Sequence, residues 1–501
     1  MSKLFDSAVD YTFTENGALT YSSSNSAVLN LFSMGGGLRD ADEDRIYKLI
    51  DKAWKENPTD TLATMLYLRD IRGGQGEKKV YRSMLTYLYG KVATRGYDFN
   101  KPYVQSVMDE LFEATIEVGS WKDITSTLNP DQYVFFVKKH MNDESTLMYK
   151  YLPSCGGGKD KQARKLAKLL GMTPKQYRKW LTENRKKLNL VESKMCANEW
   201  DKIEYGKVPS QATMLYRGAF YKHDEARYKE YIESLLSNKE SKEVKINTAT
   251  LYPYQIMGRV NCWEGESINN KSLQAMWDNL KDYTNGQDAL VIADTSGSMT
   301  GTPMDVATSL AIYFAERNKG LFKNEYITFS ENPAFIRFNE GDNLIKKKAQ
   351  MLDGPWGFNT DLVKTFQMIL TTAEDNNLSA EDMPKVLYII SDMEFDCAMG
   401  SGYNNSKSVL STTFKTIQKM FKESKYEMPT IVFWNVNSRQ DNVPVKKNEF
   451  GVVLVSGCSP STFEMVISRD INPEKFMYEV IHRDRYLDFA KKINEKFENF
   501  C

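Results

Sequence analysis

The chain has few of the residues that build zinc sites, disulfide frameworks or membrane spans. Its 501 residues include only six cysteines and three histidines, and no Cys-x-x-Cys pair occurs. Zinc clusters and disulfide frameworks are therefore not expected. No run of about eighteen apolar residues is present, so the sequence predicts no membrane-spanning helix. The opening residues, Met-Ser-Lys-Leu-Phe-Asp, lack the basic and then apolar pattern of a signal peptide. We therefore expect a reducing, cytoplasmic setting.

An excess of one charge is also missing, because 66 Lys and Arg residues balance 66 Asp and Glu residues. This balance argues against a protein whose whole surface is basic and coats nucleic acid. Hydrophobic residues make up 41% of the chain and charged residues 26%, which is typical of globular proteins. The length allows two or three domains and a large core.

The sequence pattern changes twice along the chain. Residues 1–25 are polar and irregular. Residues 26–285 carry apolar residues at three- and four-residue spacing, as in Ile46, Leu49 and Ile50, which predicts a helical, HEAT-like solenoid or ring. Residues 286–501 alternate strand and helix patterns, which predicts a doubly wound (Rossmann-like) parallel sheet and a last helix. The expected strands cover residues 289–293, 326–329, 334–338, 386–390, 430–434 and 451–455.

A polar loop follows the first of these expected strands. Its sequence is Asp294-Thr295-Ser296-Gly297-Ser298-Met299, with one carboxylate and two hydroxyls at alternate positions. Loops at the carboxyl ends of parallel strands are where such sheets bind ligands. Hard oxygen ligands suit Mg²⁺ or Mn²⁺ better than zinc or copper. One carboxylate cannot hold such an ion alone, so other loops must contribute.

Two later loops offer suitable oxygens. Thr360 stands in Gly357-Phe358-Asn359-Thr360-Asp361, before a helical pattern, and Asp392 follows an apolar run that ends in Ser391. Together the three loops resemble the metal-ion-dependent adhesion site of von Willebrand factor A domains. The resemblance implies that one Mg²⁺ or Mn²⁺ contacts the hydroxyls and that the carboxylates act directly or through water. The implied ligands are Asp294, Ser296, Ser298, Thr360 and Asp392.

The same residues allow other interpretations. The loop after Asp294 could be phosphatase-like or merely structural. The acids Asp392, Glu394 and Asp396 could bind a second ion, although a solvated loop is the simpler expectation. No histidine lies near the loop in sequence to act as a general base, so we do not expect an enzyme.

Residues 69–79 contain Arg69-Asp70-Ile71-Arg72-Gly73-Gly74-Gln75-Gly76, which looks like a phosphate loop. No Gly-Lys-Ser/Thr follows, and the stretch lies between helical patterns rather than after a strand. A helix end capped by glycine is the favoured interpretation. In the functional alternative, four cations of this stretch would contact a phosphate backbone: Arg69, Arg72, Lys78 and Lys79.

The segment from Lys159 to Lys187 is strongly basic, with eleven Lys and Arg against two acids. Within it, Ala167 is followed four residues later by Gly171 and then by Tyr177 and Trp180, which is the spacing of a DNA-reading helix-turn-helix. An ordinary helix pair with a solvated basic face explains the pattern as well. Nonspecific contact with phosphates needs only clustered charge. The candidate RNA-binding residues here are Lys159, Lys161, Arg164, Lys165, Lys168, Lys175, Arg178, Lys179, Arg185, Lys186 and Lys187.

The layout as a whole resembles Ro-type proteins, in which a helical part precedes a von Willebrand factor A domain. It resembles still more an uncharacterised family of this layout found in viruses, fungi and plants. That resemblance rests on five motifs: residues 69–74, Leu170-Gly171-Met172-Thr173-Pro174-Lys175-Gln176-Tyr177-Arg178, Trp356-Gly357-Phe358-Asn359-Thr360-Asp361, Ser391-Asp392-Met393-Glu394-Phe395 and Val455-Ser456-Gly457-Cys458-Ser459-Pro460. It covers nearly all of the chain.

The Ro resemblance implies a non-catalytic protein that binds structured or single-stranded RNA through its helical part. Its A domain would bind one divalent ion for ring closure or for docking a partner. The first alternative is a metal-dependent protein-interaction scaffold without RNA, in which a partner supplies an acidic side chain to the ion. The second alternative is a metal-dependent nuclease.

Overall fold

Six apolar runs form one sheet, because strands buried on both faces are apolar along their whole length. Each lies where the sequence predicted a strand, and the expected class, helices followed by a doubly wound sheet, is confirmed. The strands are β3 (Ala289–Asp294), β4 (Glu325–Phe329), β5 (Ala334–Arg337), β6 (Val386–Ser391), β7 (Thr430–Asn435) and β8 (Val452–Ser456).

The structure is a computed structural model that describes residues 10–94, 101–237, 244–286, 288–329, 333–353, 361–396, 412–465 and 471–498. Its chain divides into two compact units. The sheet unit contains Met1–Thr64 and Leu251–His482, and the helical unit contains Met65–Thr250 and Arg483–Cys501. The units divide the chain differently from the expected ranges 1–25, 26–285 and 286–501.

The strands of the sheet unit follow the order β5-β4-β3-β6-β7-β8. All neighbours are parallel except β4 and β5, which pair antiparallel. After β3 the chain adds the next strands on one side of β3, and after β6 it adds them on the opposite side of β6. The direction in which strands are added therefore reverses between β3 and β6. This is the topological switch point of a doubly wound fold.

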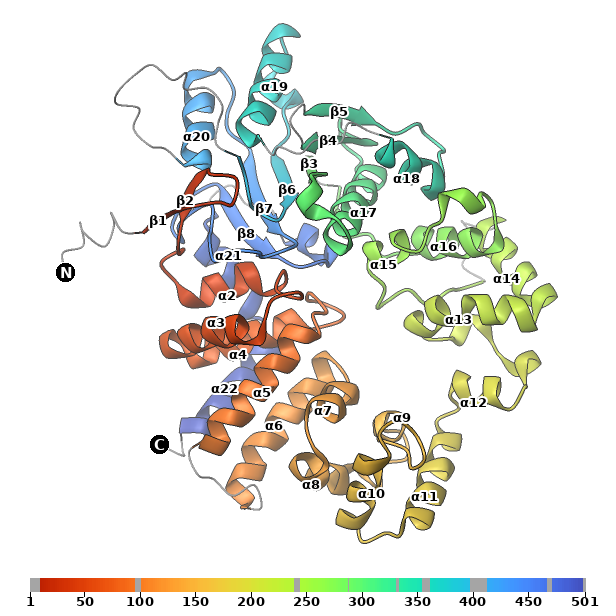
Figure 1. Cartoon of the computed structure of the whole chain (residues 1–501). Helices are drawn as coiled ribbons and strands as arrows, with labels where there is room; N and C mark the ends of the chain where they lie inside the picture. Colours follow the sequence, from red (N-terminus) through yellow and green to blue (C-terminus); the bar gives the residue numbers. More distant parts are fainter. Residues whose placement is uncertain are drawn as a thin grey trace. The chain divides into compact units, whose positions relative to one another are not determined.

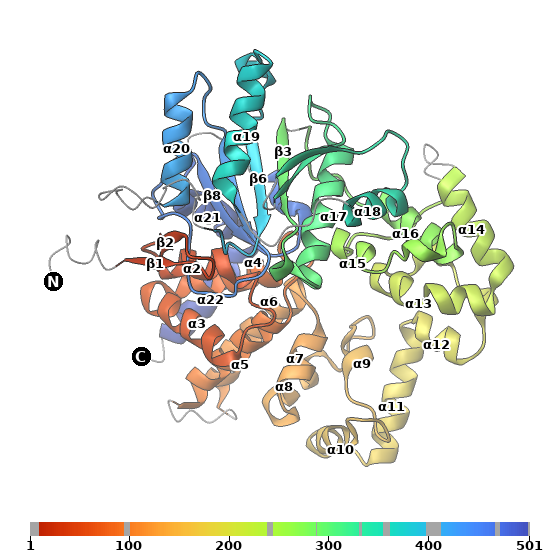
Figure 2. The same ribbon diagram turned by 45° about the horizontal axis from the view of Figure 1, so that its top comes forward.

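Helices cover both faces of this sheet, as Figure 1 shows. On one face, Phe314 of α17 packs at 5.6 Å from Tyr388 of β6 between ring centroids. On the other, Phe414 of α20 packs at 6.2 Å from Phe433 of β7. The helices of this part are α15 (Pro253–Met257), α16 (Ile268–Asp278), α17 (Thr302–Arg317), α18 (Leu344–Leu352), α19 (Leu362–Asp375), α20 (Thr413–Glu423) and α21 (Pro473–Ile481). Figure 2 shows the same sheet and helices from a second direction.

Residues 10–25 join the sheet unit and contain two strands, whereas the sequence predicted an irregular segment. β1 (Tyr11–Phe13) and β2 (Leu19–Tyr21) pair antiparallel. The helices α2 (Ala27–Gly35) and α3 (Glu43–Glu56) follow. The hydroxyl of Ser456 at the end of β8 donates to the carbonyl of Phe32 in α2 at 2.7 Å. A side chain on Gly36 would lie 2.5 Å from the backbone of Gly457, so this close approach requires glycine.

The helical unit is built from helices between residues 65 and 237 and from the last helix of the chain. The boundary between the sheet unit and the helical unit falls within α4 (Pro58–Arg69), after Thr64. The others are α5 (Lys79–Thr94), α6 (Pro102–Val118), α7 (Trp121–Thr127), α8 (Pro130–His140), α9 (Met148–Tyr151), α10 (Asp160–Leu169), α11 (Pro174–Lys187), α12 (Val191–Cys196), α13 (Ser210–His223), α14 (Glu225–Ser237) and α22 (Asp484–Glu498).

The last helix, α22, packs against α6 within the helical unit. Arg485 at its start pairs with the fully buried carboxylate of Asp70 at 2.6 Å, and the hydroxyl of Tyr486 donates to the same carboxylate at 3.0 Å. This helix therefore belongs with the helices that precede the sheet in sequence.

Within the described residues, no helix is both long and apolar enough to cross a bilayer.

Candidate functional site

Two loops meet at the switch point between β3 and β6. Asp294 ends β3, and Ser391 ends β6 directly before Asp392. The hydroxyl of Ser391 donates to Asp294 Oδ2 at 2.6 Å, so the two loops are hydrogen-bonded to each other. The sequence predicted that these residues lie at strand ends, and the sheet order places the two strands side by side.

The loop after β3 turns its hydroxyls toward one another. The backbone amide of Ser296 donates to Asp294 Oδ1 at 2.9 Å, and the hydroxyls of Ser296 and Ser298 lie 3.0 Å apart. Ser296 is buried and Ser298 is partly exposed. The loop thus brings one carboxylate and two hydroxyl oxygens together within five residues.

The site carries concentrated negative charge. Asp294 and Asp392 are both buried, with exposed fractions of 0% and 1%. Burial, together with the neighbouring Asp392, raises the pKa of Asp294 to about 7. The donor set of two buried carboxylates and nearby hydroxyls fits a hard divalent cation, because such an ion would compensate charges that burial leaves costly.

The loop after β6 is held in a strained conformation. Met393 has φ +67°, a region that a long side chain rarely adopts and that is typical of functional loops. Glu394 is 2% exposed and accepts hydrogen bonds from the amide of Glu15 at 2.7 Å and from Asn442 Nδ2 at 3.0 Å. Burial raises the pKa of Glu394. The expectation of a solvated loop here was wrong.

The reason is that the N-terminal segment covers this loop. Thr14 Oγ1 donates to the carbonyl of Phe395, and Asn16 Nδ2 donates to the carbonyl of Glu394, both at 2.6 Å. Arg439 contacts Asp392 at 3.5 Å and also pairs with Glu15. Nothing in the local pattern of residues 1–25 predicted this contact, because its partners lie more than 370 residues away in sequence.

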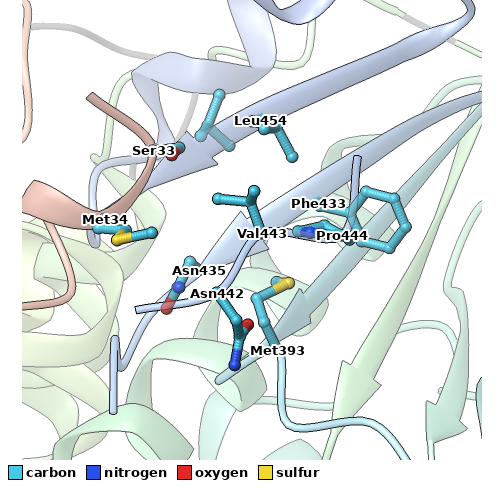
Figure 3. A pocket seen from close by; sticks show the side chains of 10 residues that line it. Ser33, Met34, Met393, Phe433, Asn435, Asn442, Val443, Pro444 and Leu454 are labelled. Carbon is cyan, nitrogen blue, oxygen red and sulfur yellow. The ribbon is translucent and has the colours of Figure 1, made fainter. Parts of the chain in front are cut away.

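A small cavity lies under the same loop, between Met393, Asn435 and Asn442, and Figure 3 shows its lining. Its volume of about 10 Å³ has room for about one water molecule. It is therefore too small for an organic ligand.

One predicted ligand, Thr360, lies outside the described residues. The next residue, Asp361, is described: its side chain accepts from the amide of Lys364 at 3.0 Å and caps α19. The expected helix start at this point is confirmed. Among the described residues, no cluster of three or more His, Cys, Asp or Glu side chains could hold a metal ion. A second, all-carboxylate ion site on the loop after β6 therefore has no support in that part of the chain.

The histidines make contacts away from these loops. Each is held by neighbours that do not belong to the candidate ion site. His140 lies 3.2 Å from Glu113, His223 stacks on Trp200, and His482 lies 2.7 Å from Asp60.

The basic segment forms the helix pair α10–α11, whose turn contains Gly171 at φ +72°. Its apolar stripe is inside: Leu166 and Tyr177 are fully buried, and the Tyr177 hydroxyl donates to the carbonyl of Pro153. Most of its cations are outside. The exposed ones are Lys159, Lys161, Arg164, Lys165, Lys168, Lys175, Arg178, Lys179, Lys186 and Lys187.

Three candidate arginines have different surroundings. Arg69 is 2% exposed and donates through Nε and Nη2 to the buried carboxylate of Asp123, at 3.0 and 2.7 Å. Arg69 therefore cannot contact a phosphate, and this candidate was wrong. Arg185 is half-buried and donates to carbonyls and a hydroxyl of the helical unit, whereas Arg72 is exposed.

The glycine loop after Arg69 is structural. A side chain on Gly74 would lie 1.9 Å from the carbonyl oxygen of Tyr67, so only glycine fits at this helix end. Asp70, buried in the same loop, pairs with Arg485. These contacts agree with the favoured interpretation of a helix end and not with a phosphate loop.

Comparison with known proteins gives relatives of unknown function. Residues 288–498 match a domain of unknown function, DUF7788. An uncharacterized protein of Acanthamoeba polyphaga mimivirus, L728, is 28% identical and covers 94% of this chain and 87% of its own length.

A solved structure also aligns with the chain. The Ro (RSR) protein of Deinococcus radiodurans is 11% identical, covers 94% of this chain and 99% of its own, and has a TM-score of 0.37. The strongest assignment comes from a second family model, which matches residues 14–148 and 154–294, more than half of the chain. The chain therefore belongs to the family described as a domain of unknown function, DUF2828.

Proposed function

We propose that this protein binds RNA without catalysis, through the basic helix pair α10–α11. The observation that carries this proposal is a set of exposed cations that form no salt bridge within the described part of the chain. They are Lys161, Lys168, Lys175, Arg178 and Lys186. Release of counterions from a phosphate backbone makes such clustered charge a source of affinity.

Four other exposed cations of the helix pair make surface pairs with acids: Arg164, Lys165, Lys179 and Lys187. Arg164 pairs with Asp160 at 2.6 Å, and Lys187 pairs with Glu144 at 2.7 Å. Pairs as exposed as these contribute little to stability, so a phosphate can compete for their cations. Contacts of this kind position a nucleic acid but read no sequence.

The sheet unit contributes a site for one divalent ion in the proposed function. Asp294, Ser296, Ser298 and Asp392 would hold the ion, and Thr360 is the further candidate. When bound, Mg²⁺ or Mn²⁺ would present an open coordination position to an acidic side chain. Ser391 orients Asp294 for this role through its 2.6 Å hydrogen bond.

The test measures RNA affinity as a function of salt. Four exposed cations of α11 are changed to Glu in one variant: Lys175, Arg178, Lys179 and Lys186. For single-stranded RNA, the slope of log affinity against log salt should fall by about 0.7 for each phosphate-binding cation that is removed. We therefore expect weaker binding and a flatter slope.

A matched control reverses the charge of four exposed lysines of the sheet unit, Lys323, Lys419, Lys422 and Lys425. This control should bind RNA like the wild type. Equal decreases in affinity in both variants would show a general charge effect and contradict the assignment to α10–α11. Absence of RNA binding by the wild type would instead favour the protein-interaction scaffold.

A further inference from the structure

A cavity of about 400 Å³ opens beside the loop that joins α9 and α10, within the helical unit. Its lining contains three lysines, several hydroxyls and no acidic residue. The lining residues are Lys122, Thr125, Ser126, Lys150, Tyr151, Leu152, Pro153, Ser154, Gly157, Gly158 and Lys159.

The positive charge of this cavity is only partly compensated. Lys150 pairs with Glu192 at 2.8 Å. Lys122 and Lys159 form no salt bridge within the described residues, and Lys159 Nζ donates to the carbonyl of Thr125 at 3.3 Å. One of the three ammonium groups therefore has an acidic partner among the described residues.

A fourth cation, Arg185, contacts a residue that lines the cavity. Arg185 donates through Nη1 to the hydroxyl of Ser154 at 2.8 Å, and Ser154 lines the cavity. Its Nε and Nη2 donate to the carbonyls of Tyr149 and Leu152 at 2.7 and 2.8 Å. No carboxylate accepts from this half-buried guanidinium in the described part of the chain, so its charge adds to the local excess.

Such an arrangement favours an anion that can accept several hydrogen bonds at once. A phosphate group does so, and charge-assisted bonds to phosphate are stronger than neutral ones. The volume falls in the range of small-molecule sites, so it exceeds what a phosphate alone needs. Tyr151 also lines the cavity, and aromatic rings stack on nucleic-acid bases.

The cavity also continues the basic surface. Lys159 stands directly before α10, and the exposed Lys161, Arg164 and Lys168 follow along that helix. A backbone with repeating phosphates could therefore extend from the helix face to the cavity. This continuity favours a polymeric ligand over a free phosphorylated metabolite.

We propose that this cavity binds one nucleotide unit of a single-stranded RNA, with the phosphate at Lys122 and Lys159 and the base against Tyr151. The proposal rests on the RNA-binding function proposed above and names a pocket for it. It adds two lysines, Lys122 and Lys150, that lie outside the basic segment of the sequence.

The experiment uses the full chain and measures binding of adenosine 5′-monophosphate and of inorganic phosphate by calorimetry. The variant changes Lys122 and Lys159 to Ala, and the matched control changes two exposed lysines of the helical unit that lie outside both proposed sites, Lys207 and Lys222, to Ala. We expect the variant to bind the nucleotide about tenfold more weakly, a decrease typical of removing one to two charged hydrogen bonds. The control should bind like the wild type, and inorganic phosphate should bind more weakly than the nucleotide.

A lysine-acetylation footprint on the wild type gives a readout that does not depend on the variant's folding. The nucleotide should protect Lys122 and Lys159 and leave Lys175 reactive. No nucleotide binding, equal decreases in variant and control, or no protection would overturn the proposal. Equal affinity for phosphate and nucleotide would overturn the nucleotide assignment.

The outcomes separate the two proposals. Nucleotide binding in the cavity without RNA binding would contradict the proposed function but would still show that the cavity binds a nucleotide. RNA binding that depends on α11 but not on Lys122 and Lys159 would contradict the pocket alone.

Discussion

The guanidinium of Arg439 lies 3.5 Å from the carboxylate of Asp392 and also pairs with Glu15, a residue of the N-terminal segment. A cation of the protein thus stands beside one of the two buried acids at the switch point. The side chain of Asp392 is 1% exposed, whereas that of Arg439 is 36% exposed, so the acid is buried and the arginine borders solvent. This arrangement makes the N-terminal segment a neighbour of the proposed ion site.

Changing Asp294 to Ala should abolish binding of Mg²⁺ and Mn²⁺ and leave the fold largely intact, because the carboxylate is the central ligand of the proposed site. Calorimetric titration of the ion checks this. Asp375→Asn, on the exposed end of α19, is the control and should bind the ion normally. Unchanged affinity in the Asp294 variant would show that the assignment is wrong.

Changing Arg439 to Gln should strengthen ion binding by about 3- to 10-fold, because a unit positive charge near the ion is removed. The same titration measures the effect, with Lys422→Gln as a control of equal charge change on an exposed helix face. Weaker binding in the Arg439 variant would indicate that Arg439 positions Asp392 for the ion.

The metal-free protein should lose stability as pH rises from about 4 to about 7. The pKa of Asp294 in the folded state is about 7, above its ordinary value of 3.8, because burial and Asp392 disfavour the charge. For a raised pKa, the stabilising contribution is complete below the ordinary value and is lost as pH rises through the folded value.

Thermal unfolding in the presence of a chelator measures this dependence. Asp294→Asn should flatten it, and added Mg²⁺ should stabilise the protein more above pH 7 than at pH 5. A Mg²⁺ effect of the same size at both pH values would contradict the coupling between ion and carboxylate.

Changing Asp123 to Ala should destabilise the helical unit by about 3–5 kcal/mol, since the buried Arg69 would lose its carboxylate partner. The two are joined at 2.7 Å, and their side chains are 3% and 0% exposed. Urea unfolding measures the change in stability. Asp131→Ala, which removes an exposed acid paired with Lys165, should change stability by less than about 1 kcal/mol.

No metal-dependent turnover is expected. A catalytic ion needs an oriented base beside it, and each histidine of this chain contacts residues outside the switch-point loops. Labelled single-stranded and structured RNAs and free nucleotides, incubated with Mg²⁺ or Mn²⁺, should remain intact. Cleavage that disappears in Asp294→Ala would establish the nuclease alternative.

The strands and the switch-point loop could be predicted from sequence because their signals are local. A buried parallel strand is an apolar run, and the residues after it reach the ligand-binding edge of the sheet wherever the strand lies. Asp294, Ser296 and Asp392 were placed by this logic, and the structure brings Asp294 and the loop of Asp392 together through Ser391.

Only the tertiary structure decided which distant residues meet. Arg69 and Arg72 stand three positions apart in one motif, yet Arg69 is buried and Arg72 is exposed. The buried Arg69 pairs with Asp123, 54 positions later in the sequence. The backbone amide of Glu15 donates to the carboxylate of Glu394, 379 positions later in the sequence. Lys122, Lys150 and Lys159 come from separate segments and meet at one cavity. These contacts depend on how helices and loops that are far apart in the sequence pack together. Local periodicity does not predict them, because it reports only which face of an element is apolar.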